Sequence, residues 1–215
     1  MDKGEKVDII SFTISCFIAI FAIVDPLAAI PFFLTLTETY TKEHRKHVVI
    51  QATTVAVSIL IVFALIGKYI FMALSFTISA FKIAGGIILF LVALDMVHGE
   101  RSKTKLTERD RSEALTQEEV GVVPLGTPLL AGPGAITTVM IYVSYASSNV
   151  SANVAIYLSI LIVGMLTYIL FTVSGMIYKI VGRTGLMVFS RVMGLLLAAI
   201  SIQFIIDGIT ASFRI

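Results

Sequence analysis

The sequence is poor in the residues that stabilise soluble and secreted domains. It has no tryptophan, one cysteine and 14% charged residues among its 215, whereas soluble domains carry roughly 25% charged residues. A single cysteine cannot form an internal disulfide, so we expect Cys16 to pack as a small apolar side chain. The net charge of +2 is too small to indicate a nucleic-acid partner. These shortages exclude a disulfide scaffold and argue against an ordinary soluble fold.

Motifs of the common hydrolases and metalloenzymes are missing as well. The sequence has no His-Glu-x-x-His, no Gly-x-Ser-x-Gly and no paired catalytic aspartates. The three histidines, His44, His47 and His98, fall at the ends of expected membrane spans in two separate connectors. We therefore expect no enzymatic activity, no metal site and no cofactor, and an intramembrane enzyme is a disfavoured alternative.

Long apolar runs are the main feature that is present. The chain is 57% hydrophobic with a mean hydropathy of +0.97, and runs of about 20 apolar residues are typical of transmembrane helices. The first run is longer than the apolar core of a signal peptide, so we interpret it as a membrane helix. The sequence predicts an all-α protein of the cell membrane, surrounded by the lipid bilayer. Its six spans are expected at 8–38, 48–70, 77–97, 119–146, 152–179 and 186–209.

Positive charge is concentrated in three connectors. Residues 99–118 form the longest polar stretch, with alternating acids and bases, and we expect a cytoplasmic linker there. The positive-inside rule places the three connectors in the cytoplasm and both termini outside the cell. This orientation requires each broken segment to cross the membrane rather than to re-enter it. The connectors hold 11 of the 16 lysines and arginines: Lys42, Arg45, Lys46, Arg101, Lys103, Lys105, Arg109, Arg111, Lys179, Arg183 and Arg191.

Two of the expected spans carry pairs of prolines with the same spacing. Pro26 and Pro31 lie in the first span, and Pro128 and Pro133 lie in the fourth. Each proline removes a backbone donor and clashes with the preceding turn. Interrupted backbone at membrane depth is tolerated only where protein or a water-filled cavity satisfies it. We therefore predict breaks at 25–31 and around 132–134 that form two halves of one binding site, although simple proline kinks are the alternative.

The two halves of the chain also resemble each other. Each half holds three spans, and an odd number requires the second half to enter the membrane upside down. We predict two inverted three-helix repeats, residues 1–98 and 119–215, with discontinuous first and fourth helices, as in secondary transporters. The matching pairs include Pro26 with Pro128, Pro31 with Pro133, Lys82 with Arg191 and Gly85 with Gly194.

The second break has the composition of an anion-binding helix start. After Gly132-Pro133-Gly134, a half-helix beginning at Ala135 would present free amides and the positive end of its dipole. Such an end suits a carboxylate, and Thr137 could add a hydroxyl. At the first break, we expect residues 32–35 to present free amides and a threonine hydroxyl in the same way.

Asp25 is the one carboxylate expected near the middle of the bilayer. A charge there is costly, which suggests an ammonium group, a coupling cation or a proton as its partner. The alternative is a helix cap that accepts amides of the next turn, and the two roles can coexist. Small alanines would limit the size of a bound side chain. The candidate binding residues are Asp25, Pro26, Ala28, Ala29, Ile30, Pro31, Ala131, Gly132, Pro133, Gly134, Ala135 and Thr137.

These two motifs resemble the MarC family of membrane proteins, also called the multiple-antibiotic-resistance-related family. Its first motif, Asp-Pro-Leu-Gly-Asn-x-Pro, corresponds to Asp25–Pro31, and its second, Pro-Leu-Leu-Ala-Gly-Pro-Gly-Ala-Ile, to residues 128–136. The resemblance covers the whole chain and implies a transporter of small neutral amino acids, glycine and alanine, with Asp25, Gly132, Pro133 and Gly134 at its site. One departure is Ala28-Ala29, which replaces Gly-Asn and removes a polar side chain.

The leading expectation is therefore a secondary transporter that moves a small zwitterionic amino acid by alternating access. Half-helix amides would hold the carboxylate, and Asp25 or unwound backbone carbonyls would hold the ammonium group. Coupling to a proton or to sodium is left open by the sequence. A multidrug or metabolite exporter is the alternative, but its cavity should be wide and aromatic rather than lined by alanine and glycine. A passive channel would differ in lacking saturable exchange.

Overall fold

The computed structural model describes residues 8–74, 77–99, 120–146 and 149–213, and every regular element in these ranges is a helix. The expected linker at 99–118 lies outside these ranges except for Gly99. The elements in chain order are α1 (Ile9–Val24), α2 (Pro26–Leu36), α3 (Lys42–Leu74), α4 (Ile78–His98), η1 (Gly121–Leu130), α6 (Pro133–Ala146), α7 (Val150–Thr172) and α8 (Ser174–Phe213).

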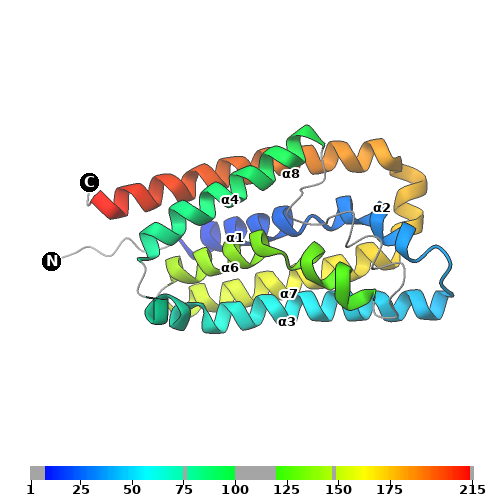
Figure 1. Ribbon diagram of the computed structural model, residues 1–215, viewed down its shortest axis with the longest axis horizontal. Helices are drawn as coiled ribbons and strands as arrows, with labels where there is room; N and C mark the ends of the chain where they lie inside the picture. Colours follow the sequence, from blue (N-terminus) through cyan, green and yellow to red (C-terminus); the bar gives the residue numbers. More distant parts are fainter. Residues whose placement is uncertain (1–7, 75–76, 100–119, 147–148, 214–215) are drawn as a thin grey trace.

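Within the described ranges, length and hydropathy identify five helical segments that can cross a membrane, and a sixth when η1 and α6 are taken as one bent span. The helix axes of η1 and α6 differ by 55°. Successive spans run in alternating directions, so α1 begins and α8 ends at the same end of the molecule (Figure 1). Six spans therefore agree with the number expected from the sequence.

The helices form three layers (Figure 1). The broken pairs α1–α2 and η1–α6 occupy the middle layer, between α4 and α8 on one side and α3 and α7 on the other. The span Ile9–Leu36 has 61% of its most apolar window buried, against 28% for Ser174–Phe213. Outer helices instead expose large apolar side chains such as Leu65 and Leu195, as expected for surfaces that face lipid. Cys16 is fully buried, as predicted.

The packing of α4 against α8 depends on the absence of side chains at contact points. The two helices lie side by side in opposite directions (Figure 1). A Cβ atom added to Gly86 would lie 2.8 Å from the backbone oxygen of Ser201, and one added to Gly194 would lie 3.0 Å from that of Ala93. Small residues thus allow close approach of the two backbones, as in other membrane helix pairs.

Several helix boundaries differ from those expected. The charged residues 42–47 are not a loop but the first turns of α3. The expected fifth span, 152–179, is too long, because α7 ends at Thr172 and Val173 closes its last turn with a backbone bond to Ile169. The chain then turns within α8 at Gly182, where φ is +67°, a value that glycine adopts without a Cβ penalty.

The first helix starts with a side-chain cap just before its apolar run. Asp8 accepts hydrogen bonds from the Ser11 hydroxyl at 2.6 Å and from the Ile10 amide at 3.2 Å. These bonds, the Ser11 hydroxyl first, hold the pKa of the Asp8 carboxyl below its ordinary value. The cap fixes the entry of the chain into α1.

Candidate functional site

The first helix break consists of one residue, Asp25, between α1 and α2. Its backbone is left-handed, with φ 46° and ψ 60°, and Pro26 occupies the first position of the next helix, where a missing amide hydrogen costs nothing. The carboxylate accepts the Ala28 amide at 3.4 Å and the Ser190 hydroxyl of α8 at 2.6 Å. Asp25 is 4% exposed. The capping role left open by the sequence is therefore present, and Ser190 is a partner that sequence reasoning missed.

The first break is shorter than the predicted one at 25–31. Pro31 lies inside α2, and the helix continues past it to Leu36. The Thr35 hydroxyl donates to the backbone oxygen of Pro31 at 2.9 Å. The free amides of this half-helix therefore lie directly after Asp25 and not at 32–35.

The second break lies at Ala131 and Gly132, between η1 and α6. The π-helical segment η1 contains extended backbone at Val123 and Thr127 and ends with the Ala131 amide bonded to Gly126 at 3.0 Å. The next helix, α6, begins at Pro133, two residues before the predicted start at Ala135. Residues 120–146 contain no acidic side chain. Unlike α2, α6 thus starts without a carboxylate from its own segment.

The two breaks lie against each other in the middle layer. A Cβ atom added to Gly134 of α6 would lie 2.9 Å from Cδ1 of Ile23, near the end of α1, and 3.6 Å from Cδ2 of Leu89 in α4. Glycine at this position allows the start of α6 to approach the end of α1. The structure thus brings together the two motifs that were singled out in the sequence.

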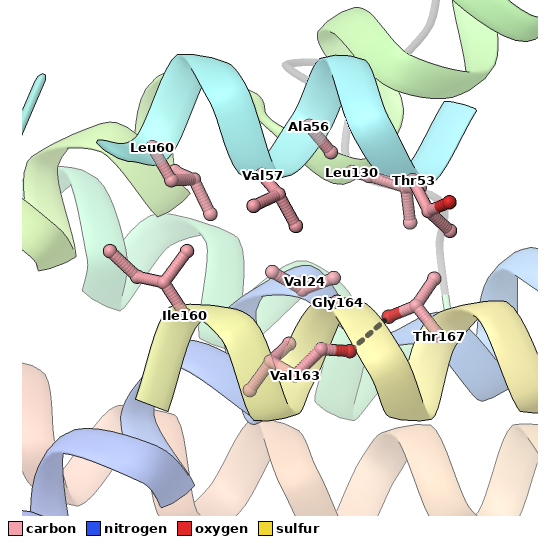
Figure 2. A pocket seen from close by; sticks show the side chains of 10 residues that line it. All are labelled: Val24, Thr53, Ala56, Val57, Leu60, Leu130, Ile160, Val163, Gly164 and Thr167. Atoms are coloured by element: carbon pink, nitrogen blue, oxygen red, sulfur yellow. Dashed lines mark hydrogen bonds between the residues drawn. The ribbon is translucent and has the colours of Figure 1, made fainter. Parts of the chain in front are cut away.

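A small cavity lies where the two breaks meet α3 and α7 (Figure 2). Its volume is about 10 Å³, enough for about one water molecule. Val24 and Leu130, the last residues of α1 and η1, contribute to its wall. The other lining residues are Thr53, Ala56, Val57 and Leu60 of α3 and Ile160, Val163, Gly164 and Thr167 of α7.

None of the twelve candidate residues is among the ten that line this cavity. Their part in binding stays a prediction. Thr137 places its methyl group towards Gly85 of α4. Nine candidates are buried, Ala28 and Pro31 are half-buried, and Pro133 is exposed; the buried ones are Asp25, Pro26, Ala29, Ile30, Ala131, Gly132, Gly134, Ala135 and Thr137.

The walls contributed by α3 and α7 were missed from the sequence. Each wall repeats one helical face, with residues at positions i, i+3, i+4 and i+7. That spacing is present in the sequence, but any packed helix shows it. It marks a cavity wall only because the two breaks lie against these two helical faces.

A polar cluster lies towards the end of the molecule where α1 begins and α8 ends. The Tyr145 hydroxyl donates to Asp207, and Gln203 donates to the same carboxylate at 2.7 Å. The Lys82 ammonium lies 3.6 Å from the centre of the Tyr145 ring, a cation–π contact. The cluster joins α4, α6 and α8. Within the described ranges, no three histidine, cysteine or acidic side chains are grouped to hold a metal ion.

Comparison with known proteins identifies relatives along nearly the whole chain. The family model described as "MarC family integral membrane protein" matches residues 10–213. A UPF0056 membrane protein of Methanocaldococcus jannaschii is 40% identical over 210 residues, covering 98% of this chain and 92% of the relative.

Bacterial relatives match over a similar share of the chain. A UPF0056 membrane protein of Aquifex aeolicus is 35% identical, covering 91% of both chains. The Escherichia coli UPF0056 membrane protein YhcE is 33% identical, covering 92% of this chain and 91% of the relative. No solved structure matches the chain. With its several apolar spans and a family match from the first helix to the last, the chain belongs to the MarC family of integral membrane proteins.

Proposed function

We propose that this protein is a secondary transporter that moves small zwitterionic amino acids, such as glycine and alanine, across the cell membrane by alternating access. The observation that carries the proposal is the meeting of both interrupted helices at one cavity, with Val24 and Leu130 in its wall. Substrate sites between paired discontinuous helices are typical of secondary transporters.

The start of α6 is suited to the substrate's carboxylate. Its first amides have no hydrogen-bond partner within the helix, and its dipole presents positive charge at this end. Because residues 120–146 contain no acidic side chain, a ligand carboxylate would meet no like charge from this segment. Gly132 and Gly134 lack a Cβ atom and let a small ligand approach the backbone.

The arrangement of the helices supports an inverted-repeat mechanism. The third span of each half, α4 and α8, pack together in opposite directions (Figure 1). The second spans, α3 and α7, line opposite walls of the cavity (Figure 2). Residues with equal spacing line both walls. Rocking of one half against the other would open the cavity to each side in turn. The cavity has to widen for transport, because glycine is several times larger than a water molecule.

The lining also weighs against the exporter alternative. None of the ten lining residues is aromatic, whereas a drug-binding cavity is expected to be lined largely by hydrophobic and aromatic side chains. A small aliphatic wall favours a small substrate.

Uptake of labelled glycine into proteoliposomes tests the proposal directly. We expect saturable uptake that exceeds protein-free vesicles, competes with alanine and responds to an imposed proton or sodium gradient if transport is ion-coupled. Gly134→Leu should abolish uptake, since its side chain would fill the contact between the two breaks.

The matched control is Gly175→Leu, because no atom lies within 4 Å of a Cβ added to Gly175. Uptake that is absent in the wild-type protein for every small neutral amino acid would refute the proposed function. Uptake that survives Gly134→Leu would refute the site.

A further inference from the structure

The cavity where the two breaks meet α3 and α7 is apolar. Eight of its ten lining residues are aliphatic or glycine, and the other two are threonines, Thr53 of α3 and Thr167 of α7. Each threonine hydroxyl donates to the backbone oxygen four residues earlier in its own helix, at 2.8 Å, and Figure 2 shows the second of these bonds. The hydroxyl hydrogens are thus used within the helices, and the cavity suits an apolar group.

The size of the cavity matches a single methyl group. Its volume of about 10 Å³ admits one group about as large as a water molecule. A buried water needs two or more polar partners, whereas an apolar cavity stays dry and accepts an apolar guest. A methyl group is only slightly larger than water, and its transfer from water into apolar surroundings is favourable. The cavity therefore suits the side chain of alanine better than either charged group of an amino acid.

The charged groups of a substrate have a separate place, at the breaks beside the cavity. Val24 and Leu130 line the cavity, and each is the last residue of its helix before a break. The Asp25 carboxylate follows Val24 directly, and α6 begins three residues after Leu130. A substrate with its carboxylate and ammonium group at the breaks would point its side chain between α3 and α7.

The walls on α3 and α7 restrict the size of that side chain. A Cβ added to Gly164 of α7 would lie 2.3 Å from Cγ2 of Val57 of α3, so the two walls leave no space for a further carbon atom there. The buried Ile160 side chain points from α7 into the space between the two helices (Figure 2). The alanines expected from the sequence to limit side-chain size do not line the cavity: Ala28, Ala29, Ala131 and Ala135.

On the basis of the proposed function, we infer that this cavity is the side-chain pocket of the substrate site and that Ile160 and Gly164 determine its specificity. The pocket receives the methyl group of alanine, stays empty when glycine is bound and excludes the ethyl group of 2-aminobutyric acid. The missing side chain of Gly164 lets α3 approach α7, and Ile160 closes one end. Larger neutral amino acids are rejected because they overpack this pocket.

Amino acids that differ by one carbon atom test the assignment. The purified protein in detergent is heated with glycine, L-alanine, L-2-aminobutyric acid or L-norvaline, and the shift in Tm gives the apparent affinity. We expect the wild-type protein to bind alanine about fourfold more tightly than glycine, the effect of one buried methyl group. It should bind 2-aminobutyric acid roughly tenfold more weakly than alanine because of overpacking, and norvaline more weakly still.

Two variants change the pocket in opposite directions. Ile160→Val removes one carbon atom from a buried wall, so the preference for alanine over 2-aminobutyric acid should fall roughly tenfold. Gly164→Ala fills the pocket and should remove the preference for alanine over glycine. Ile162→Val is the matched control, the same change on the same helix at a side chain that is 48% exposed. Because affinities are compared as ratios within one variant, a change in overall stability does not alter the result.

The possible failures are distinguishable. If no small neutral amino acid stabilises the wild-type protein, the proposed function fails and this inference fails with it. If amino acids bind but the wild-type protein and Ile160→Val rank them identically, the function stands and the assignment of the side-chain pocket is overturned. Equal binding of alanine and 2-aminobutyric acid by the wild-type protein, or an equal change of ranking in Ile162→Val, would overturn it as well.

Discussion

Both helix breaks leave backbone groups without partners within a helix, and the two breaks satisfy these groups in different ways. Backbone bonds close both breaks, from the Asp25 amide to Phe21 at the first and from the Ala131 amide to Gly126 at the second. The first break adds side chains, because Asp25 caps α2 and accepts the Ser190 hydroxyl of α8. The first break thus has a side-chain cap, while the Gly134 and Ala135 amides at the start of α6 have no partner within their own helix. Under the proposed function, the first break would serve as a fixed support and the second would bind the ligand.

Both broken spans are nevertheless attached to the same helix. Ser190 of α8 bonds to Asp25, and Asp207 of α8 receives the hydroxyl of Tyr145, near the end of α6. A movement of α8 would therefore be transmitted to both broken spans through these hydrogen bonds. The following variants compare how much the contacts at each break contribute to the free energy of unfolding, beginning with the largest expected effect.

Asp25→Ala should have the largest effect on stability. It removes the cap of α2, leaves the partly buried Ser190 hydroxyl without its carboxylate partner and places alanine in a left-handed backbone. We expect a loss of roughly 3–4 kcal/mol in the free energy of unfolding, measured by reversible unfolding in mixed micelles. Asp25→Asn, which keeps an acceptor oxygen and tolerates this backbone, should lose clearly less. Equal losses for the two variants would contradict the capping role.

Gly134→Ala tests the second break through packing alone. Its Cβ would lie 2.9 Å from Cδ1 of Ile23, and overpacking of this kind costs about 2 kcal/mol. Ile23→Val removes the clashing methyl group, so the double variant should recover much of the loss measured in the same unfolding assay. Gly175→Ala is the control, because its Cβ meets no atom within 4 Å. A double variant no more stable than Gly134→Ala would argue against a direct contact.

The contrast between the breaks also explains what could be predicted from the sequence. Proline spacing and hydropathy indicated six spans and interruptions in the first and fourth, because these depend on local backbone chemistry. The exact breaks were harder to predict: Pro31 continues a helix that Asp25 and Pro26 had already restarted. The bond between Asp25 and Ser190 spans 165 residues, and nothing local in the sequence marks it.

The cavity walls show the same limit of prediction from the sequence. Val57 and Gly164 belong to ordinary helical faces that line a cavity only because α3 and α7 face each other across the breaks. The Lys82 ammonium lies on the Tyr145 ring, a contact between α4 and α6 that nothing local in the sequence marks. Contacts between distant segments, and not local composition, decide these roles.

Ser190→Ala should destabilise the first break less than Asp25→Ala does. It removes one donor to the Asp25 carboxylate but leaves the cap on Ala28, so we expect a loss of roughly 1.5 kcal/mol in the free energy of unfolding. If the two residues act through each other, Ser190→Ala should cost almost nothing in the Asp25→Ala background. Additive losses would mean that Ser190 contributes to stability independently of the break.

Tyr145→Phe should have the smallest effect and concerns the attachment of α6 to α8. It removes the hydroxyl that donates to Asp207 and keeps both the bond from Gln203 and the ring beneath Lys82. Because the carboxylate retains one donor, and hydrogen bonds between membrane helices are worth about 0.6 kcal/mol on average, we expect a loss of that size. Tyr69→Phe is the control, at a tyrosine that is 66% exposed. A loss as large as that of Ser190→Ala would show that α8 holds the two broken spans with equal strength, and the first break would then no longer be the firmer support.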